Sequence, residues 1–477
     1  MKRSDKQKKW STGDLVELEI ETLSFGSRGV ARSEGFVWFV DRALPGQKVM
    51  ARIRKVKKQY GEASVAEVLE PGPHQIQAPC PYFGTCGGCQ LQHMDYSAQV
   101  ESKTRQIQEI LAHLGGIPVP PVRDTLPSEK IFHYRNKMEF TFSDRRWILP
   151  EDPPDAPRDF ALGLHVPRQY QKVLDIDACL LQEPVCNDIL STLRELIPDT
   201  GLPPYSVQHH SGFWRFLVMR TGARTGDVML NFLTSGQMRQ GDEVMDTLAE
   251  TLRKRHPQIT TLIHSISDSL AQVAYGEASR VLFGTGKISE VILDRRFEIS
   301  PDAFFQTNSF QCESLFRTIM ELGDFKKSEI VYDLYCGTGA IGIVLAHRVR
   351  KVVGIEVIPQ AVEDARRNAE INRLDNTEFI LADMKDALHT DAVFGLHGLP
   401  DAVILDPPRG GTHPRTIRDL VHMAPPRIVY VSCNPAILAR DLQFLHPGYD
   451  IEAVQPVDMF PHTGHIETVS LLTKRKS

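Results

Sequence analysis

The N-terminal part of the chain alternates apolar and polar residues with a period of two, which is the period of a β-strand. Residues 15–20 and 36–40 are two such runs, and a glycine-containing turn at 26–29 lies between them. In a third run, residues 48–58, positions 49, 51 and 53 are apolar and basic residues stand largely between them. We therefore predict a small, OB-like β-barrel over residues 11–70. Its basic strand face suits contact with a phosphate backbone, but it equally suits a solvated edge protected by lysines.

The middle of the chain has a weaker pattern. Residues 71–73, Pro-Gly-Pro, indicate a domain boundary. Helical periodicity follows over residues 97–113 and stops at a Gly-Gly pair. From about residue 125, short apolar runs alternate with turns. We predict a central α+β domain over residues 71–300.

Two stretches of this central part place aromatic residues beside cations, at 134–140 and 213–216. Aromatic rings and cations together can stack on and neutralise single-stranded RNA. The same mixture is also found on ordinary sheet faces, so both interpretations stay open.

From residue 301 onward, apolar strand-like runs alternate with helical segments, which predicts a doubly wound, Rossmann-like domain over 301–477. The first strand of this domain leads into a glycine-rich turn at 337–339, and the second ends in Glu356. The next two strands are followed by Asp383 and Asp406. In such sheets the glycines let backbone approach a ligand, and the second-strand acid binds ribose hydroxyls.

The glycine-rich turn reads D-L-Y-C-G-T-G and does not match the dinucleotide pattern G-x-G-x-x-G. Its leading acid, Asp333, disfavours a pyrophosphate and favours a cationic ligand. S-adenosylmethionine carries both a sulfonium and an ammonium group. We therefore expect it to be the ligand of this domain.

Cys433 follows the apolar run 429–432, at the carboxyl end of a predicted strand. Open α/β sheets bind their ligands at this end, so a thiol here is placed to act as a nucleophile. A cysteine beside a β-rich run is more often a small buried apolar residue, and the remaining motifs have to decide between the two.

Composition restricts the class of protein. A chain of 477 residues with 42% hydrophobic and 24% charged residues is typical of a globular protein of about three domains. No apolar run reaches the ~18 residues that span a bilayer, and the charged N-terminus is not followed by a signal-peptide core. We expect a cytoplasmic protein without membrane contact. Because the net charge is −5, nucleic acid would have to bind to local basic patches.

Three of the eight cysteines form a C-x5-C-x2-C array, Cys80, Cys86 and Cys89. Clustered thiols in a reducing compartment indicate metal ligation and not disulfides. Three thiolates need a fourth ligand, for which Cys179 is a better candidate than Cys186 because it follows a strand-like segment. The spacing alone does not distinguish an iron–sulfur cluster from structural zinc.

Taken together, six motifs resemble the RNA uracil-5 methyltransferases with an N-terminal TRAM module, most closely the 23S ribosomal RNA branch. They are the cysteine array with Cys179, F-F-Q-T-N at 304–308, D-L-Y-C-G-T-G at 333–339, D-P-P-R at 406–409, S-C-N-P at 432–435 and H-T-G-H-I-E at 462–467. The resemblance covers nearly the whole chain. It implies a TRAM barrel, a central domain with an iron–sulfur loop, and a C-terminal S-adenosylmethionine-dependent methyltransferase domain.

The resemblance also implies roles for individual residues. The four cysteines would hold a [4Fe–4S] cluster, Cys433 would be the nucleophile and Glu467 the general base, with His465 as an alternative base. Some relatives have asparagine where this chain has Ala340 or Asp383, which puts donor contacts at those positions in question. The positions matching donor-binding or neighbouring substrate residues are Gln306, Tyr335, Glu356, Asp383 and Asp406.

On this basis we expect methylation of uracil C5 in RNA, with ribosomal RNA favoured over transfer RNA, by a monomer. An amino-group methyltransferase would need an aromatic residue after Asp-Pro-Pro, where this chain has Arg409. A radical methylthiolating enzyme usually has its cysteines spaced C-x3-C-x2-C within a barrel. The array of this chain is spaced C-x5-C-x2-C, which argues against that class of enzyme. An inactive, RNA-binding methyltransferase fold is the non-enzyme alternative, and the presence of both Cys433 and Glu467 argues against it.

Overall fold

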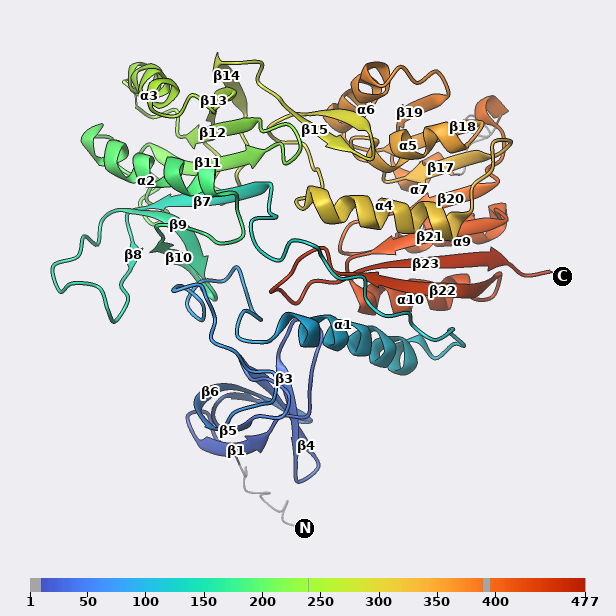
Figure 1. The fold of residues 1–477 in the computed structure, drawn as a ribbon, viewed down its shortest axis with the longest axis horizontal. Helices are drawn as coiled ribbons and strands as arrows, with labels where there is room; N and C mark the ends of the chain where they lie inside the picture. The colour runs from blue at the N-terminus through green and yellow to red at the C-terminus, as the bar shows by residue number, and fades with distance from the viewer. Residues whose placement is uncertain (1–9, 239, 389–394, 477) are drawn as a thin grey trace, which may run out of the picture.

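A computed structural model describes residues 10–238, 240–388 and 395–476. The charged N-terminal segment considered above as a possible signal sequence, residues 1–9, lies outside the described residues. Three large sheets, formed one after another along the chain, and one two-stranded sheet between the second and third organise the described part (Figure 1).

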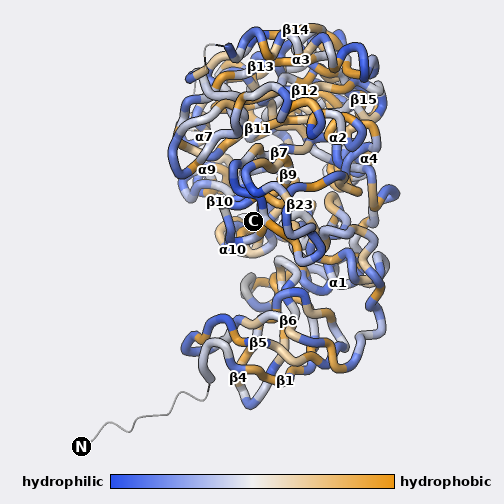
Figure 2. The backbone as a smooth tube through the Cα atoms, turned by 90° about the vertical axis from the view of Figure 1, so that its left-hand side faces the viewer, coloured by the Kyte–Doolittle hydropathy of each residue, from blue (hydrophilic) through white to orange (hydrophobic). Residues whose placement is uncertain are grey.

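The N-terminal sheet has the strand order β1-β5-β6-β4-β3-β2. On β5 the apolar positions 49, 51 and 53 are buried around Trp38, whereas Arg52 and Arg54 are exposed, which confirms the predicted alternation. Gly61 is required here, because a Cβ would lie 2.2 Å from the Trp38 ring. These strands form a separate lobe (Figures 1 and 2). Their bounds are β1 (Leu15–Glu19), β2 (Thr22–Leu23), β3 (Gly29–Ser33), β4 (Phe36–Asp41), β5 (Lys48–Val56) and β6 (Tyr60–Glu70).

The predicted helix after the cysteine array is α1 (Tyr96–Ile110), extended by a π-helical turn, η1 (Leu111–Gly115). Asp95 caps its start by accepting a hydrogen bond from the Ser97 backbone N–H (2.9 Å), and Gly116 ends it in the left-handed conformation. In Figure 1, α1 lies between the N-terminal lobe and the C-terminal sheet.

The central sheet has eight strands in the order β14-β13-β12-β11-β7-β9-β10-β8, and α2 and α3 pack against one face. This mixed sheet agrees with the expected α+β pattern. The bounds are β7 (Lys137–Ser143), β8 (Arg146–Trp147), β9 (Ala161–Val166), β10 (Gln169–Asp175), α2 (Pro184–Asp199), β11 (Trp214–Thr221), β12 (Val228–Thr234), α3 (Gly241–Arg255), β13 (Thr261–Ile266) and β14 (Ala278–Phe283).

The cluster of aromatic residues at 213–216 belongs to the core of this domain. Phe213, Trp214 and Phe216 are buried, and the guanidinium of Arg215 is also buried and donates to the carbonyls of Ser267 and Ser269. These side chains therefore cannot stack on RNA, and the ordinary-sheet interpretation is the correct one for this cluster.

The C-terminal sheet has the strand order β19-β18-β17-β20-β21-β23-β22. Its first five strands are parallel, and β23 is antiparallel to both β21 and β22, so the predicted doubly wound layer is confirmed. The bounds are α4 (Ser309–Gly323), β17 (Ile330–Leu334), α5 (Ala340–Leu345), η2 (Ala346–Arg348), β18 (Lys351–Glu356), α6 (Pro359–Ile371), β19 (Thr377–Leu381), α7 (Met384–Ala387), β20 (Ala402–Leu405), α9 (Pro414–Met423), β21 (Arg427–Ser432), α10 (Pro435–Leu445), β22 (Tyr449–Val457) and β23 (Glu467–Lys474).

Two segments of the predicted 71–300 domain pack with this C-terminal sheet instead. Ile107 of α1 is buried in one core with Leu438 and Leu442 of α10. The hairpin β15 (Ile288–Ile292) and β16 (Arg295–Ile299) shares the core on the opposite face with α4, α5 and α6. The C-terminal sheet is therefore covered on both faces, partly by residues that precede it by a long way in sequence.

No helix within the described ranges is long and apolar enough to cross a membrane. The expected cytoplasmic location stays a prediction.

A buried ion pair joins α1 to the segment that follows β22 of the C-terminal sheet. The Nζ of Lys103 lies 2.6 Å from Oδ1 of Asp458, and the side chains are 1% and 0% exposed. Tyr96 donates its hydroxyl to the other carboxylate oxygen (2.9 Å), and Phe460 N–H donates to the first (3.2 Å). Buried charges are tolerated only when paired and hydrogen-bonded in this way.

Replacing Lys103 by methionine is expected to destabilise the fold by about 3–5 kcal/mol, because Asp458 is left as a buried carboxylate without a cation. The measurement is urea unfolding followed by circular dichroism. Lys48→Met is the matched control, because it breaks a solvent-exposed pair with Glu17 (2.9 Å) and should shift the midpoint far less. Equal shifts for the two variants would contradict the importance of the buried pair.

Candidate active site

Strand register brings Cys433 and Glu467 together. Ser432, the last residue of β21, pairs with Thr468 of the antiparallel strand β23. One position further along, Cys433 and Glu467 therefore face each other across the two strands. Asn434 turns the chain away after Cys433 by capping α10, its side chain accepting from Ala436 N–H (3.2 Å).

Burial dominates the protonation of this pair. It raises the pKa of the half-buried Cys433 thiol to about 11, and the neighbouring Glu467 acts in the same direction. Glu467 is 7% exposed, and burial raises its pKa well above the usual value, with Asp406 adding to the effect. Burial also raises the pKa of Asp406 to about 7. Burial therefore favours the thiol form of Cys433 and the protonated form of Glu467.

Arg409, from the D-P-P-R turn after β20, supplies positive charge to the same place. Its exposed guanidinium lowers the pKa of both Cys433 and Glu467. Arg409 is not among the predicted site residues. The available signal was its position directly after Asp406-Pro-Pro, at the carboxyl end of the strand beside the Cys433 strand.

His465 lies two residues before Glu467. Burial, followed by Arg409, lowers the pKa of His465 to about 4, so its imidazole is neutral at physiological pH. A neutral ring can accept a proton, and His465 therefore remains chemically able to act as a base.

The glycine-rich turn at the end of β17 is held by acids. Both oxygens of Glu356 accept backbone hydrogen bonds, from Gly337 (3.0 Å) on one side and from Val357 (2.8 Å) and Ile358 (3.0 Å) on the other. Tyr335 has a φ of +63°, which is uncommon for a residue with a side chain and is typical of functional turns. Glu356 thus shapes the turn, and any ribose contact would be made by a carboxylate that already has these bonds.

The same edge fits a ligand that combines a flat apolar ring with positive charge. Val357, Ile358 and Leu381 expose 54%, 57% and 50% of their surfaces at the ends of β18 and β19. Asp333 is fully buried, and its Oδ1 has no hydrogen-bond partner among the described residues. Burial raises the pKa of Asp333 to about 7. An apolar shelf beside under-compensated acids suits the adenine and the cationic centre of S-adenosylmethionine.

The other predicted donor residues lie around this edge in different environments. Tyr335 hydrogen-bonds Thr416 near the start of α9. Asp383 is exposed and caps α7 by accepting from Lys385 N–H (2.9 Å), a bond that lowers the pKa of Asp383. The Gln306 side chain is partly exposed, and its backbone carbonyl accepts from Asn136 (3.0 Å).

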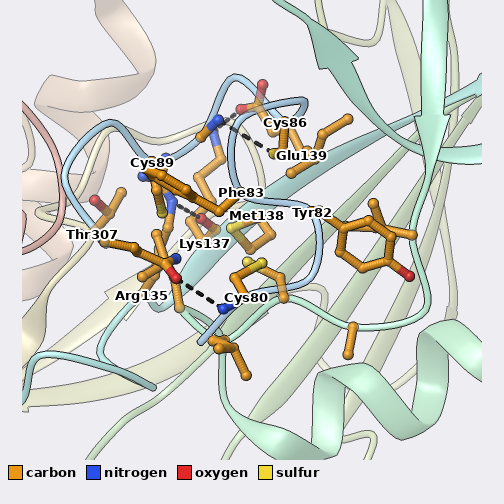
Figure 3. Close-up of a pocket in the computed structure, with 18 of the residues that line it drawn as sticks. Cys80, Tyr82, Phe83, Cys86, Cys89, Arg135, Lys137, Met138, Glu139 and Thr307 are labelled. Carbon is orange, nitrogen blue, oxygen red and sulfur yellow. Dashed lines mark hydrogen bonds and ion pairs between the residues drawn. The ribbon is translucent and has the colours of Figure 1, made fainter. Parts of the chain in front are cut away.

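The cysteine array and Cys179 line a single cavity of about 430 Å³ (Figure 3). Tyr82 of the array accepts from the Asp177 backbone N–H (2.9 Å), which fastens the array to the segment that carries Cys179. Cys186 is buried on α2 and is not among the described lining residues. The four predicted ligands are therefore neighbours.

Within the described ranges, no three or more His, Cys, Asp or Glu side chains converge closely enough to hold a metal ion. The four half-buried thiols surround a space, and burial raises the pKa of Cys86 to about 11 and of Cys89 to about 12.

A second cavity, of about 450 Å³, lies between the N-terminal lobe and the cysteine array. Asp41 is the one acidic residue among its described lining residues. Phe83 and two of the array cysteines line both cavities, so the array forms the wall between them. We call this cavity the arginine cleft, because it is lined by Arg28, Arg42, Arg54 and Arg168.

Comparison with known proteins agrees with this arrangement. Residues 9–66 match the TRAM domain family, and residues 246–475 match the tRNA (Uracil-5-)-methyltransferase family. An uncharacterized RNA methyltransferase of Chlorobaculum tepidum is 40% identical over 470 residues, which is 97% of each chain. One from Halalkalibacterium halodurans is 36% identical over 470 residues, covering 98% of this chain and 99% of its own.

Among solved structures, the chain is similar to Pyrococcus abyssi tRNA (uracil-54, C5)-methyltransferase in complex with S-adenosyl-L-homocysteine. The TM-score is 0.74 and the identity 30%, and the match covers 96% of this chain and 100% of the other. The family matches, the full-length relatives and the shared fold show that the chain is an enzyme, an S-adenosylmethionine-dependent methyltransferase, and that it belongs to the TRAM-domain RNA uracil-5 methyltransferase family.

Proposed function

We propose that the enzyme methylates carbon 5 of a uracil in RNA through a covalent bond between Cys433 and carbon 6 of the base, with Glu467 as the general base. The register that sets a thiol opposite a buried carboxyl group at the ligand-binding edge is the observation that carries this proposal. As substrate we favour 23S ribosomal RNA, and transfer RNA, the substrate named for the Pyrococcus abyssi neighbour, is the alternative.

A thiol solves a chemical problem of this substrate. Uracil C5 is too weak a nucleophile to take a methyl group directly. When the Cys433 sulfur adds to C6, the electron pair of the 5,6 double bond moves to C5 and O4, and C5 becomes nucleophilic. S-adenosylmethionine supplies the methyl group when bound. Cys433 must act as a thiolate, a form that Arg409 favours by lowering the thiol pKa.

The second half of the reaction needs a base. After methyl transfer, the Glu467 carboxylate removes the proton from C5, the 5,6 double bond re-forms, and the Cys433 sulfur leaves as a thiolate. Arg409 lowers the pKa of Glu467 and so favours the carboxylate form. Asp406 and Gln306 are proposed to hydrogen-bond the edge of the uracil and its developing charge.

RNA in which uridine is replaced by 5-fluorouridine is expected to form a denaturation-stable complex with the enzyme when the donor is present, because no base can remove fluorine from C5. Gel electrophoresis under denaturing conditions measures the complex, using transcripts of 23S ribosomal RNA and of transfer RNA side by side. The ribosomal transcript should react.

Cys433→Ala should abolish the complex, and an adduct that persists in this variant would refute the nucleophile assignment. A complex with transfer RNA alone would establish the alternative substrate. If neither transcript forms a complex with the wild-type enzyme, the covalent mechanism proposed for Cys433 is refuted.

We further propose that Cys80, Cys86, Cys89 and Cys179 hold a [4Fe–4S] cluster. Four thiols around one cavity match the ligand set of such a cluster. Because the thiols line a cavity and do not converge on one position, a cluster of several atoms suits them better than a single metal ion. Uracil methylation by this route needs no oxidant or reductant, so the cluster would be structural, joining the array to the Cys179 segment.

Protein purified without oxygen is expected to be brown, with broad visible absorption that disappears on exposure to air, and to contain iron and sulfide. Cys179→Ala should lose this absorption, whereas Cys186→Ala should keep it, because Cys186 lies away from the cavity on α2. A colourless protein with stoichiometric zinc would overturn the iron–sulfur assignment in favour of structural zinc.

The arginine cleft supports binding of the RNA backbone. Arg28, Arg42 and Arg54 have no carboxylate partner among the described residues, whereas Arg168 pairs with Asp41 (2.9 Å). A cavity with several such cations suits phosphate groups. Ser27 and Gln90 also line it, and both lie beside the segment that precedes Glu467. We propose that RNA flanking the target uridine binds in this cleft.

Arg54→Gln is expected to weaken RNA binding and to lower the slope of log Kd against log salt by about 0.7, the loss of one phosphate contact with a single strand. Fluorescence anisotropy with a labelled oligouridylate measures both values. Arg52→Gln is the matched control, since Arg52 is an exposed arginine on the same strand that does not line the cleft. Identical effects of the two variants would exclude the cleft as the binding path.

A further inference from the structure

The segment that leads into Glu467 crosses from β22 to β23 and is held from outside its own sheet. We call residues 458–466 the base turn. Its first residue, Asp458, is paired with Lys103 of α1, and the same lysine donates to the carbonyl of Phe460 (3.3 Å). The next carbonyl, of Pro461, accepts from the hydroxyl of Tyr134 (3.1 Å).

Gln99 of α1 makes the central contact with the base turn. Its side chain is fully buried, and its Oε1 accepts from the backbone N–H of His462 (3.0 Å). Its amide nitrogen donates to the carbonyls of Leu91 (3.0 Å) and Met94 (2.8 Å). One side-chain amide therefore joins the base turn to the segment that follows the cysteine array.

The segment that follows the cysteine array also contacts the base turn directly, and so does the N-terminal lobe. The carbonyl of His462 accepts two hydrogen bonds, from the backbone N–H groups of Gln90 (2.9 Å) and Leu91 (3.0 Å). Gly464 packs so closely on the N-terminal lobe that a Cβ would lie 2.5 Å from Ser27 Oγ and 2.9 Å from Gly26 Cα.

The base turn needs this support because its conformation is unfavourable on its own. His462 has a φ of +65°, a conformation that is unfavourable for a residue with a side chain and persists only where the surroundings impose it. The His462 ring is also fixed, by stacking on Phe132 at 4.4 Å between ring centres.

From these contacts we propose that Gln99 is a positioning residue for the reaction, which sets the base turn and thereby the reach of Glu467. The proposal rests on the proposed function, in which Glu467 removes the C5 proton. Gln99 lies on a helix outside the catalytic sheet and acts through His462.

Loss of Gln99 should therefore have a step-specific consequence. Addition of Cys433 and methyl transfer precede the work of Glu467, so they do not need a correctly placed carboxylate. Proton removal and release of the thiolate do need it. A displaced base turn should leave the methylated base attached to Cys433 for longer.

The test is Gln99→Met, which keeps a long unbranched side chain and removes every hydrogen bond of the amide. The RNA is the transcript whose 5-fluorouridine form reacts with the wild-type enzyme, now made with ordinary uridine. On this RNA the variant should accumulate a denaturation-stable enzyme–RNA complex that carries the transferred methyl group. The kcat should fall at least tenfold, and KM for RNA should change little. Gln106→Met is the matched control, since Gln106 is a buried glutamine on the same helix whose amide donates to Ser102; it should behave as wild type.

Gly464→Ala tests the same turn from the other side, because the added Cβ must move the turn away from Gly26 and Ser27. It should show the same accumulation, and it replaces Gln99→Met if that variant does not fold. Loss of adduct and product in equal proportion, or turnover without accumulation, would overturn the positioning role. Wild-type reaction with 5-fluorouridine RNA tests the proposed function separately, so the two failures are distinguishable.

Discussion

The antiparallel insertion of β23 between β21 and β22 is the constraint on which the candidate site depends. The five parallel strands build a ligand-binding edge, but a parallel sheet alone would bring no further strand start to that edge. Because β23 runs the other way, its first residue lies where β21 ends, and Glu467 meets Cys433. A slip of one residue would turn Glu467 to the opposite face of the sheet. Strand register is therefore part of the geometry of the candidate site.

Several acids lie along the edge itself. Asp333 and Glu467 are buried and Asp406 is partly buried, burial raises the pKa of all three carboxyl groups, and each raises the pKa of a neighbour. Such a group of acids gains stability from a ligand or side chain that brings positive charge. Arg409 meets part of this need from the rim. The electrostatics of this edge thus agree with a cationic methyl donor independently of sequence resemblance.

Much of the C-terminal fold could be predicted because its signals are local. Each of the strands β17, β18 and β20 is a short apolar run followed by a glycine turn or an acid, and each was expected where it occurs. The docking of α1 was not predictable in the same way. Its buried face contains Gln99, Lys103 and Gln106, which in sequence resemble a solvated surface. Partners that are distant in sequence, among them Asp458 and His462, make that face an interior one.

The aromatic cluster at 213–216 illustrates the opposite error. An arginine between aromatic residues resembles an RNA-binding surface, yet Arg215 is buried because loop carbonyls satisfy its guanidinium. Arg409, in contrast, was not predicted as a site residue, since its effect on Cys433 arises from the neighbouring positions of β20 and β21 in the sheet. In both cases the decisive information is which segments meet in space.

The pairing of Lys103 with Asp458 also bears on how the protein is made. The two residues are 355 positions apart, so α1 leaves the ribosome long before its partner exists. Until then Lys103 has no carboxylate partner and Gln99 lacks its hydrogen bond to His462, whereas the N-terminal lobe can already fold. Closing such a distant contact is slow and comes late in folding. The base turn and the side chains that support it are therefore completed together, only after β23 has been synthesised.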